Sequence, residues 1–77
     1  MGCMKQYLIG VLEEIGSMCK HLYPVDVWDI YEDAGADSNI PDPYHFTLLV
    51  VLYIESMYGN EPLEEFIRKE LARCYTC

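Results

Sequence analysis

Apolar residues at the start of the chain recur at steps of three and four. This spacing places them on one side of a helix with 3.6 residues per turn, and it predicts an amphipathic helix over residues 4–22. The apolar side of this helix consists of Met4, Tyr7, Leu8, Val11, Leu12, Ile15, Met18, Cys19 and Leu22. Gly10 and Gly16 interrupt the segment, and a glycine weakens a helix by up to about 1 kcal/mol relative to alanine. We interpret the two glycines as points at which another element packs closely against the helix.

The same spacing predicts a second, shorter helix over residues 25–34, with Gly35 suited to end it. Its inward-facing residues are Val27, Trp28, Tyr31 and Ala34. The opposite side carries Asp26, Asp29 and Asp33, which also recur at steps of three and four. One face of this helix is therefore expected to be apolar and the other anionic.

A loop and a third helix are predicted next. Residues 35–43 are rich in glycine, proline and turn-forming side chains, which is typical of a long connection. Asp42 is suited to cap a helix over residues 43–58, with Pro43 as its first residue. Residues 46–54 are apolar on every side and rich in β-branched side chains, so a buried strand is an alternative. We favour the helix because the caps fit and the sequence offers no partner strand.

A fourth helix is predicted over residues 61–74, because Gly59 interrupts the chain and Pro62 is suited to a first helical turn. Its apolar stripe consists of Leu63, Phe66, Ile67, Leu71 and Cys74. Four helices in 77 residues predict one compact all-α domain over residues 1–77, a four-helix fold. The third helix is nearly fully apolar and is expected at its centre.

Acidic residues dominate the charge of the chain. Thirteen Asp and Glu against five Lys and Arg give a formal net charge of -8, which disfavours direct binding to nucleic acid. Residues 21–67 contain no Lys or Arg. The acids of this segment are Asp26, Asp29, Glu32, Asp33, Asp37, Asp42, Glu55, Glu61, Glu64 and Glu65. Such a segment concentrates negative potential around the second helix and the loop after it.

This charge pattern predicts a binding surface for a basic protein. The predicted partner-binding residues are Asp26, Asp29, Glu32, Asp33, Asp37 and Asp42, with Tyr31 and Tyr44 as exposed aromatic anchors. We expect an inhibitor or adaptor that occludes the basic surface of a nucleic-acid-binding protein or nuclease. Phage inhibitors of nucleases and CRISPR effectors, antitoxins and immunity proteins are of this type. An acidic surface that simply faces water is the alternative.

The cysteines and histidines do not form a recognisable catalytic or metal-binding motif. Cys74 and Cys77 have the C-x-x-C spacing of redox and zinc sites, but no second ligand pair accompanies them. His21 and His45 have no nucleophile at a familiar spacing. We expect no catalysis, no cofactor and no bound metal. The chain shows no export signal and its longest apolar run is too short for a membrane span, so we expect a cytoplasmic protein with free thiols.

One short segment resembles a known family. Residues 32–38, Glu-Asp-Ala-Gly-Ala-Asp-Ser, are similar to the Gly-Ala-Asp-Ser stretch of acyl carrier proteins, in which the serine carries a phosphopantetheine arm. The resemblance implies modification of Ser38, and the length, acidity and predicted helices also match that family. In carrier proteins the serine begins a long helix, whereas Pro41 and Pro43 follow Ser38 here and prevent a regular helix at that point. An acyl-carrier-like protein is an alternative to the inhibitor.

Self-association is a third interpretation. A four-helix domain of this size does not fully cover a third helix that is apolar all round. A homodimeric helical module would cover it.

Overall fold

The four segments predicted as helices are each α-helical in the structure. The computed structural model describes the backbone of residues 2–74 and the side chains of residues 6–73. Its helices are α1 (Gly2–Met18), α2 (Pro24–Ala36), α3 (Pro43–Ser56) and α4 (Glu61–Cys74). This range contains no strand, and the segment 46–54 is helical. The predicted all-α four-helix fold is confirmed.

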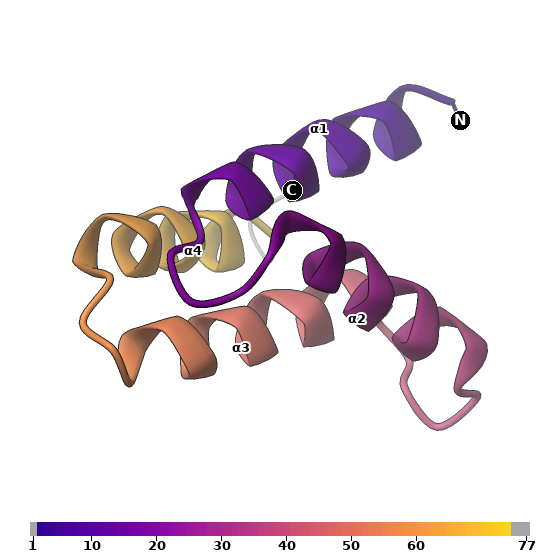
Figure 1. The fold of residues 1–77 in the computed structure, drawn as a ribbon. Helices are drawn as coiled ribbons and strands as arrows, with labels where there is room; N and C mark the ends of the chain where they lie inside the picture. Colours follow the sequence, from indigo (N-terminus) through magenta and orange to yellow (C-terminus); the bar gives the residue numbers. More distant parts are fainter. Residues whose placement is uncertain (1, 75–77) are drawn as a thin grey trace.

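The helices form a closed ring of contacts. α2 packs against α1 and α3, while α4 packs against α3 and α1. In Figure 1, α1 lies above α3, and α2 and α4 lie at the two sides between them. The chain therefore buries one face of each helix against two neighbours.

The shared core is aliphatic and draws on every helix. Its residues with at most 1% exposure are Leu12 and Ile15 of α1, Val27 of α2, Leu48 and Val51 of α3, and Leu63 and Ile67 of α4. Those of α1, α2 and α4 lie on the inward stripes expected from the three- and four-residue spacing. Burial of such side chains is the main source of stability in a domain of this kind.

Local signals set most helix ends. Pro24 is the first residue of α2, and the Asp26 carboxylate accepts a hydrogen bond from the Tyr23 backbone N–H at 3.1 Å. Asp42 caps α3 as predicted, since its carboxylate accepts from the His45 backbone N–H at 3.1 Å. Gly59, at a φ of 80°, makes the turn between α3 and α4, a conformation that suits glycine.

The C-terminal ends of three predicted helices differ from the structure, and α3 ends at Ser56 rather than at residue 58. α1 ends at Met18, whereas the stripe extended it to residue 22. The reason is that residues 19–23 form a loop held by a buried side chain of α3, described below. α2 continues through Gly35 to Ala36, so this glycine lies inside the helix and does not end it.

The two glycines of α1 have different surroundings. A Cβ atom on Gly16 would lie 3.2 Å from both Cα and Cβ of Pro24, so the predicted close approach is confirmed there. A Cβ atom on Gly10 would meet nothing within 4 Å, so the same interpretation is wrong for Gly10.

α3 is covered on one side only. Its inward side carries two polar residues, Thr47 and Glu55, which are 0% and 1% exposed. Several apolar residues of α3 instead face outward, among them Leu49 and Tyr53. The expectation of a nearly fully apolar helix at the centre of the fold is therefore not confirmed.

Candidate functional site

Three of the predicted acids form the outward face of α2. Asp29, Glu32 and Asp33 are exposed, and they lie opposite the buried Val27 and Ala34 of the same helix. Their spacing of three and four residues brings neighbouring side chains to about 5–6 Å at Cβ. We call these three residues the acidic face of α2.

The other three predicted acids serve the local backbone. The Asp26 and Asp42 carboxylates accept hydrogen bonds from backbone N–H groups at the starts of α2 and α3. The Asp37 carboxylate accepts from the Asn39 backbone N–H at 2.9 Å. Asp37 and Asp42 are exposed and lie in the loop that follows the acidic face of α2. These three carboxylates therefore fix the ends of α2 and α3.

No described lysine or arginine neutralises the acidic surface. Within residues 6–73, none of the six predicted acids forms an ion pair with a lysine or arginine. The cations of α4 pair with acids of the same helix: Arg68 with Glu64 at 3.0 Å, Lys69 with Glu65 at 3.5 Å, and Arg73 with Glu70 at 3.3 Å. The negative field of α2 and its loop therefore has no counter-charge from the opposite side of the molecule.

The predicted aromatic anchors are not available as expected. Tyr44 is only 7% exposed and belongs to the core, because it lies on the same face of α3 as Leu48 and Val51. Its assignment as an exposed anchor is wrong. Tyr31 is half-buried against the core, edge-on to Trp28 with 6.2 Å between ring centroids. The inward stripe of α2 thus turns Tyr31 toward the core, and the inward face of α3 does the same for Tyr44.

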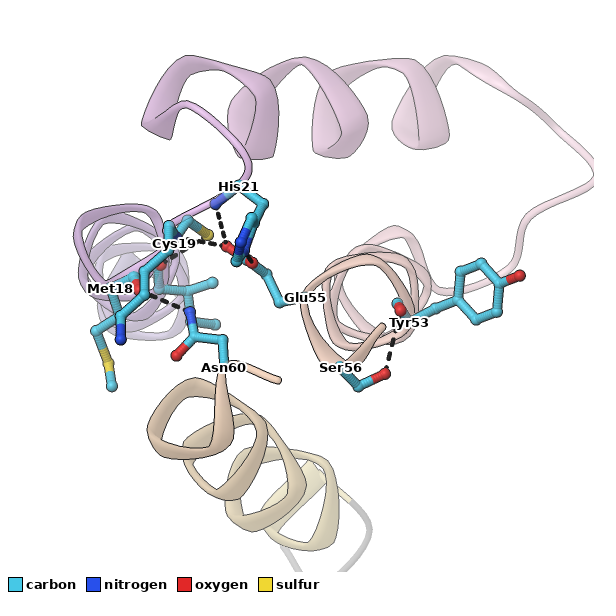
Figure 2. A network of polar contacts seen from close by, with 9 residues as sticks. Met18, Cys19, His21, Tyr53, Glu55, Ser56 and Asn60 are labelled. Atoms are coloured by element: carbon cyan, nitrogen blue, oxygen red, sulfur yellow. Dashed lines mark hydrogen bonds and ion pairs between the residues drawn. The ribbon is translucent and has the colours of Figure 1, made fainter. Parts of the chain in front are cut away.

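A second cluster, which sequence reasoning missed, centres on the buried carboxylate of Glu55. Its Oε1 accepts from the backbone N–H groups of Lys20 at 2.6 Å and His21 at 3.1 Å. Its Oε2 lies 2.7 Å from Nδ1 of the His21 ring. Figure 2 shows this carboxylate reaching from α3 into the loop that follows α1. We call Glu55 and the groups around it the Glu55 cluster.

Neighbouring residues complete the Glu55 cluster. The His21 ring stacks on Tyr58, with 4.3 Å between centroids. The Asn60 side-chain amide donates to the Met18 carbonyl oxygen at 3.1 Å, at the last turn of α1. The end of α3 and the start of α4 thereby hold both sides of the loop between α1 and α2.

The electrostatics of the Glu55 cluster favour a carboxylate beside a neutral thiol. Burial alone raises the pKa of Glu55, but the hydrogen bonds from His21 and Lys20 outweigh it and hold the pKa below its usual value. An ionised carboxylate only accepts hydrogen bonds, so Nδ1 of His21 carries the proton between them. Burial, and then the charge of Glu55, raises the pKa of Cys19 to about 12. Cys19 is thus a thiol that donates to the Ile15 carbonyl at 3.2 Å, which does not suit a nucleophile.

A signal for Glu55 was present in the sequence. Glu55 follows Leu48 and Val51 at steps of three and four, so it shares their inward face. It was instead counted with the acids of the negative segment. Helical spacing from Leu48 and Val51 gives the direction of Glu55 once the inward side of α3 is known.

The remaining predicted sites can be placed in the structure only in part. Ser38 is exposed in a turn between α2 and α3, and α3 begins at Pro43, so no helix starts at this serine. The side chains of Cys74 and Cys77 lie outside the described residues. Within residues 6–73 no group of three histidine, cysteine or acidic side chains could hold a metal ion. The described helices are too short or too polar to cross a membrane.

Comparison with known proteins gives no information on the function of this chain. No protein-family model, no curated protein and no solved structure matches this chain.

Proposed function

We propose that the protein is a small binding module whose acidic α2 and following loop occupy a basic surface of another protein. The observation that carries the proposal is the acidic face of α2, where three exposed carboxylates have no described lysine or arginine partner. Charges that are not compensated within the molecule are available to a partner, and they accelerate association with a surface of opposite sign.

The spacing of the carboxylates supports one class of partner protein. Asp29 and Asp33 lie one helical turn apart, with Glu32 beside them, so a rigid helix presents a row of negative groups. Lysine and arginine side chains that grip phosphates along a nucleic acid are arranged to meet such a row. We infer that the partner is a nucleic-acid-binding protein or nuclease, and that the module acts by steric and electrostatic occlusion, as inhibitors carried by phages do.

Two charge-reversal variants with the same change in net charge test this proposal. One is Asp29→Lys/Glu32→Lys on α2, and its control is Glu13→Lys/Glu14→Lys on the exposed side of α1. Asp26 is left intact, because its reversal would remove the cap of α2. The fold of each variant is checked by circular dichroism.

The readout is affinity capture of partners followed by release of a labelled double-stranded DNA from the captured protein. We expect the wild type and the α1 variant to retain the partner and displace the DNA, and the α2 variant to lose both properties. Raising the salt from about 0.05 M to about 0.5 M is expected to weaken capture, because it screens the charges. Equal capture by all three proteins would show that this surface is not the binding site.

A further inference from the structure

The outward side of α3 carries an apolar stripe that the fold leaves uncovered. It consists of Phe46, Leu49 and Tyr53, with Met57 just beyond the end of the helix. These side chains are 39%, 44%, 67% and 64% exposed, respectively. Figure 2 shows Tyr53 projecting from α3 away from α1 and α4. Steps of three and four residues place the four side chains in one row about 16 Å long, at 1.5 Å per residue.

The polarity of α3 differs from that expected for a surface helix, although Leu48 and Val51 are buried on its inward side. A surface helix usually turns apolar residues inward and polar residues outward. α3 buries Thr47 and Glu55, while its outward row is apolar. The exposed sides of the other helices carry charged residues, such as Glu13 on α1, Asp29 on α2 and Lys69 on α4. The needs of the monomer core therefore do not account for the apolar row on α3.

Charge indicates what covers the row. Between Phe46 and Met57 the chain has one charged residue, Glu55, and it points inward to the loop after α1. A basic partner would gain no ion pair on this surface. Another uncharged apolar row fits it, and a second copy of this chain supplies one.

Symmetry makes the row complementary to itself. In an antiparallel two-fold pair of α3 helices, each row crosses its copy about the point midway between Leu49 and Tyr53. Phe46 of each copy then approaches Met57 of the other, and Leu49 approaches Tyr53. Aromatic and methionine side chains are well suited to such a contact, because they bury a large area and adapt in shape.

The available area sets the strength of this contact. The exposed parts of the four side chains amount to roughly 400 Å² per copy, taking about 200 Å² for each large side chain. Two copies bury twice that area, and the half-buried Val50 and Ile54 beside the row add to it. The sum stays below about 1,200 Å², the lower end of stable specific interfaces, and is in the range of weak, transient contacts. A dimer of this size dissociates on dilution.

We propose that the protein forms a weak symmetric homodimer through the row of Phe46, Leu49, Tyr53 and Met57 on α3. The proposal is independent of the acidic face of α2, which lies on another helix. The two copies carry a net charge of -8 each, so they repel at long range. Salt is therefore expected to strengthen the dimer, the opposite of its effect on a basic partner.

Analytical ultracentrifugation of the full chain tests this proposal. Samples span about 10 µM to about 1 mM at low and high salt, a range in which weak dimers dissociate. We expect the mass to rise from 8.9 kDa toward twice that value with concentration, and to rise at lower concentration in high salt. A mass that stays at the monomer value at both salt concentrations overturns the proposal and leaves the row to a different protein.

Two single variants locate the interface. Tyr53→Glu places a charge in the row, and Val25→Glu places one on an apolar residue of α2 that is similarly exposed, at 60%. Both positions are at the surface, and circular dichroism verifies that each variant folds. Tyr53→Glu is expected to raise the dimer dissociation constant at least tenfold. Val25→Glu is expected to dimerise like the wild type, apart from the effect of its extra charge. If Tyr53→Glu dimerises as well as Val25→Glu does, the interface is not on α3.

Discussion

Glu55 and His21 lie 34 residues apart in the sequence and are joined through both the backbone and the ring of the histidine. The carboxylate that makes these contacts is 1% exposed and also accepts from the backbone of Lys20. The loop between α1 and α2 would otherwise present two backbone N–H groups without a helical partner. One buried side chain of α3 thus fixes the direction in which the chain leaves α1 and enters α2.

Replacing Glu55 is expected to lower the free energy of unfolding, and Glu55→Ala is expected to lower it more than Glu55→Gln. Glu55→Gln keeps an acceptor for the loop but loses the charge, at a cost of about 1.5 kcal/mol, near the lower limit for hydrogen bonds to charged groups. Glu55→Ala leaves the N–H groups of Lys20 and His21 unpaired and opens a cavity, so its cost is about 3 kcal/mol or more. Urea unfolding followed by circular dichroism measures both values.

Glu14→Gln is the matched control for these variants. Glu14 is an exposed glutamate of α1, and such a surface change is expected to stay within about 0.5 kcal/mol of the wild type. Stabilities of Glu55→Gln and Glu14→Gln that agree within error would contradict the role assigned to the Glu55 cluster.

The contribution of Glu55 is expected to depend on pH in the acidic range. The folded-state pKa of Glu55 lies below its ordinary value of 4.5, so the folded protein binds this proton less readily than the unfolded chain does. The resulting stabilisation is complete above pH 4.5 and is lost as the pH falls through the folded-state pKa. Subtracting the free energy of unfolding of Glu55→Gln from that of the wild type, between pH 7 and pH 2, isolates this effect from the other acids. A difference that stays constant or grows toward low pH would show that the carboxylate is not stabilised in the fold.

Local signals were sufficient to predict the fold, because the stripes of α1, α2 and α4 need only local spacing and the cap residue Asp42 marks the start of α3. Contacts between distant residues were not predictable in this way. The end of α1 depends on Glu55, which is far away in sequence, so the stripe alone extended that helix too far. The direction of Tyr44 was misjudged for a related reason, since a residue near a loop was treated as exposed without regard to its helical face.

For the acidic face of α2, charge and helical spacing predicted which residues are exposed. The exposure of Asp29 and Asp33 follows from their position opposite the apolar stripe of α2. The row on α3 is a different case, because an all-apolar segment does not indicate which side is covered by neighbours. Only the packing of α2 and α4 against α3 determines that Tyr53 faces outward.

The two glycines of α1 offer a matched pair for stability. Gly10→Ala adds a methyl group in open space inside a helix, and we expect it to stabilise the fold by about 0.5–1 kcal/mol. Gly16→Ala gains the same helix propensity but places its Cβ 3.2 Å from the Cα of Pro24, at the start of α2. Displacing that backbone is expected to make it about 1–3 kcal/mol less stable than Gly10→Ala. Urea unfolding of the two variants provides the comparison, and equal stabilities would mean that α2 does not approach α1 at Gly16.

Cys19 is expected to resist alkylation in the folded protein. Because burial and the charge of Glu55 raise its pKa from 9.0 to about 12, its thiolate fraction at pH 8 falls about a thousandfold. Short pulses of iodoacetamide, with mass spectrometry of the peptide that contains Cys19, compare folded and urea-unfolded protein. Glu55→Gln removes one cause of the shift and should accelerate the reaction of the folded form. Equal rates in the folded and unfolded protein would place Cys19 in contact with solvent as an ordinary thiol.

Asp42 and Asp29 are expected to differ in role: Asp42 supports the fold, whereas Asp29 is available to a partner. Asp42→Ala removes the side-chain acceptor for the His45 N–H at the start of α3, and loss of an N-cap costs about 1 kcal/mol of stability. Asp29→Ala removes an exposed carboxylate on α2 and should change stability by less than about 0.5 kcal/mol. Thermal or urea unfolding measures the stability of the two variants, and we expect Asp42→Ala to be the less stable one. Binding to a captured partner should show the reverse order, because Asp29→Ala is expected to lose more affinity. If Asp29→Ala proved the more destabilising variant, its carboxylate would be a structural group, and the acidic face of α2 would lose its central member.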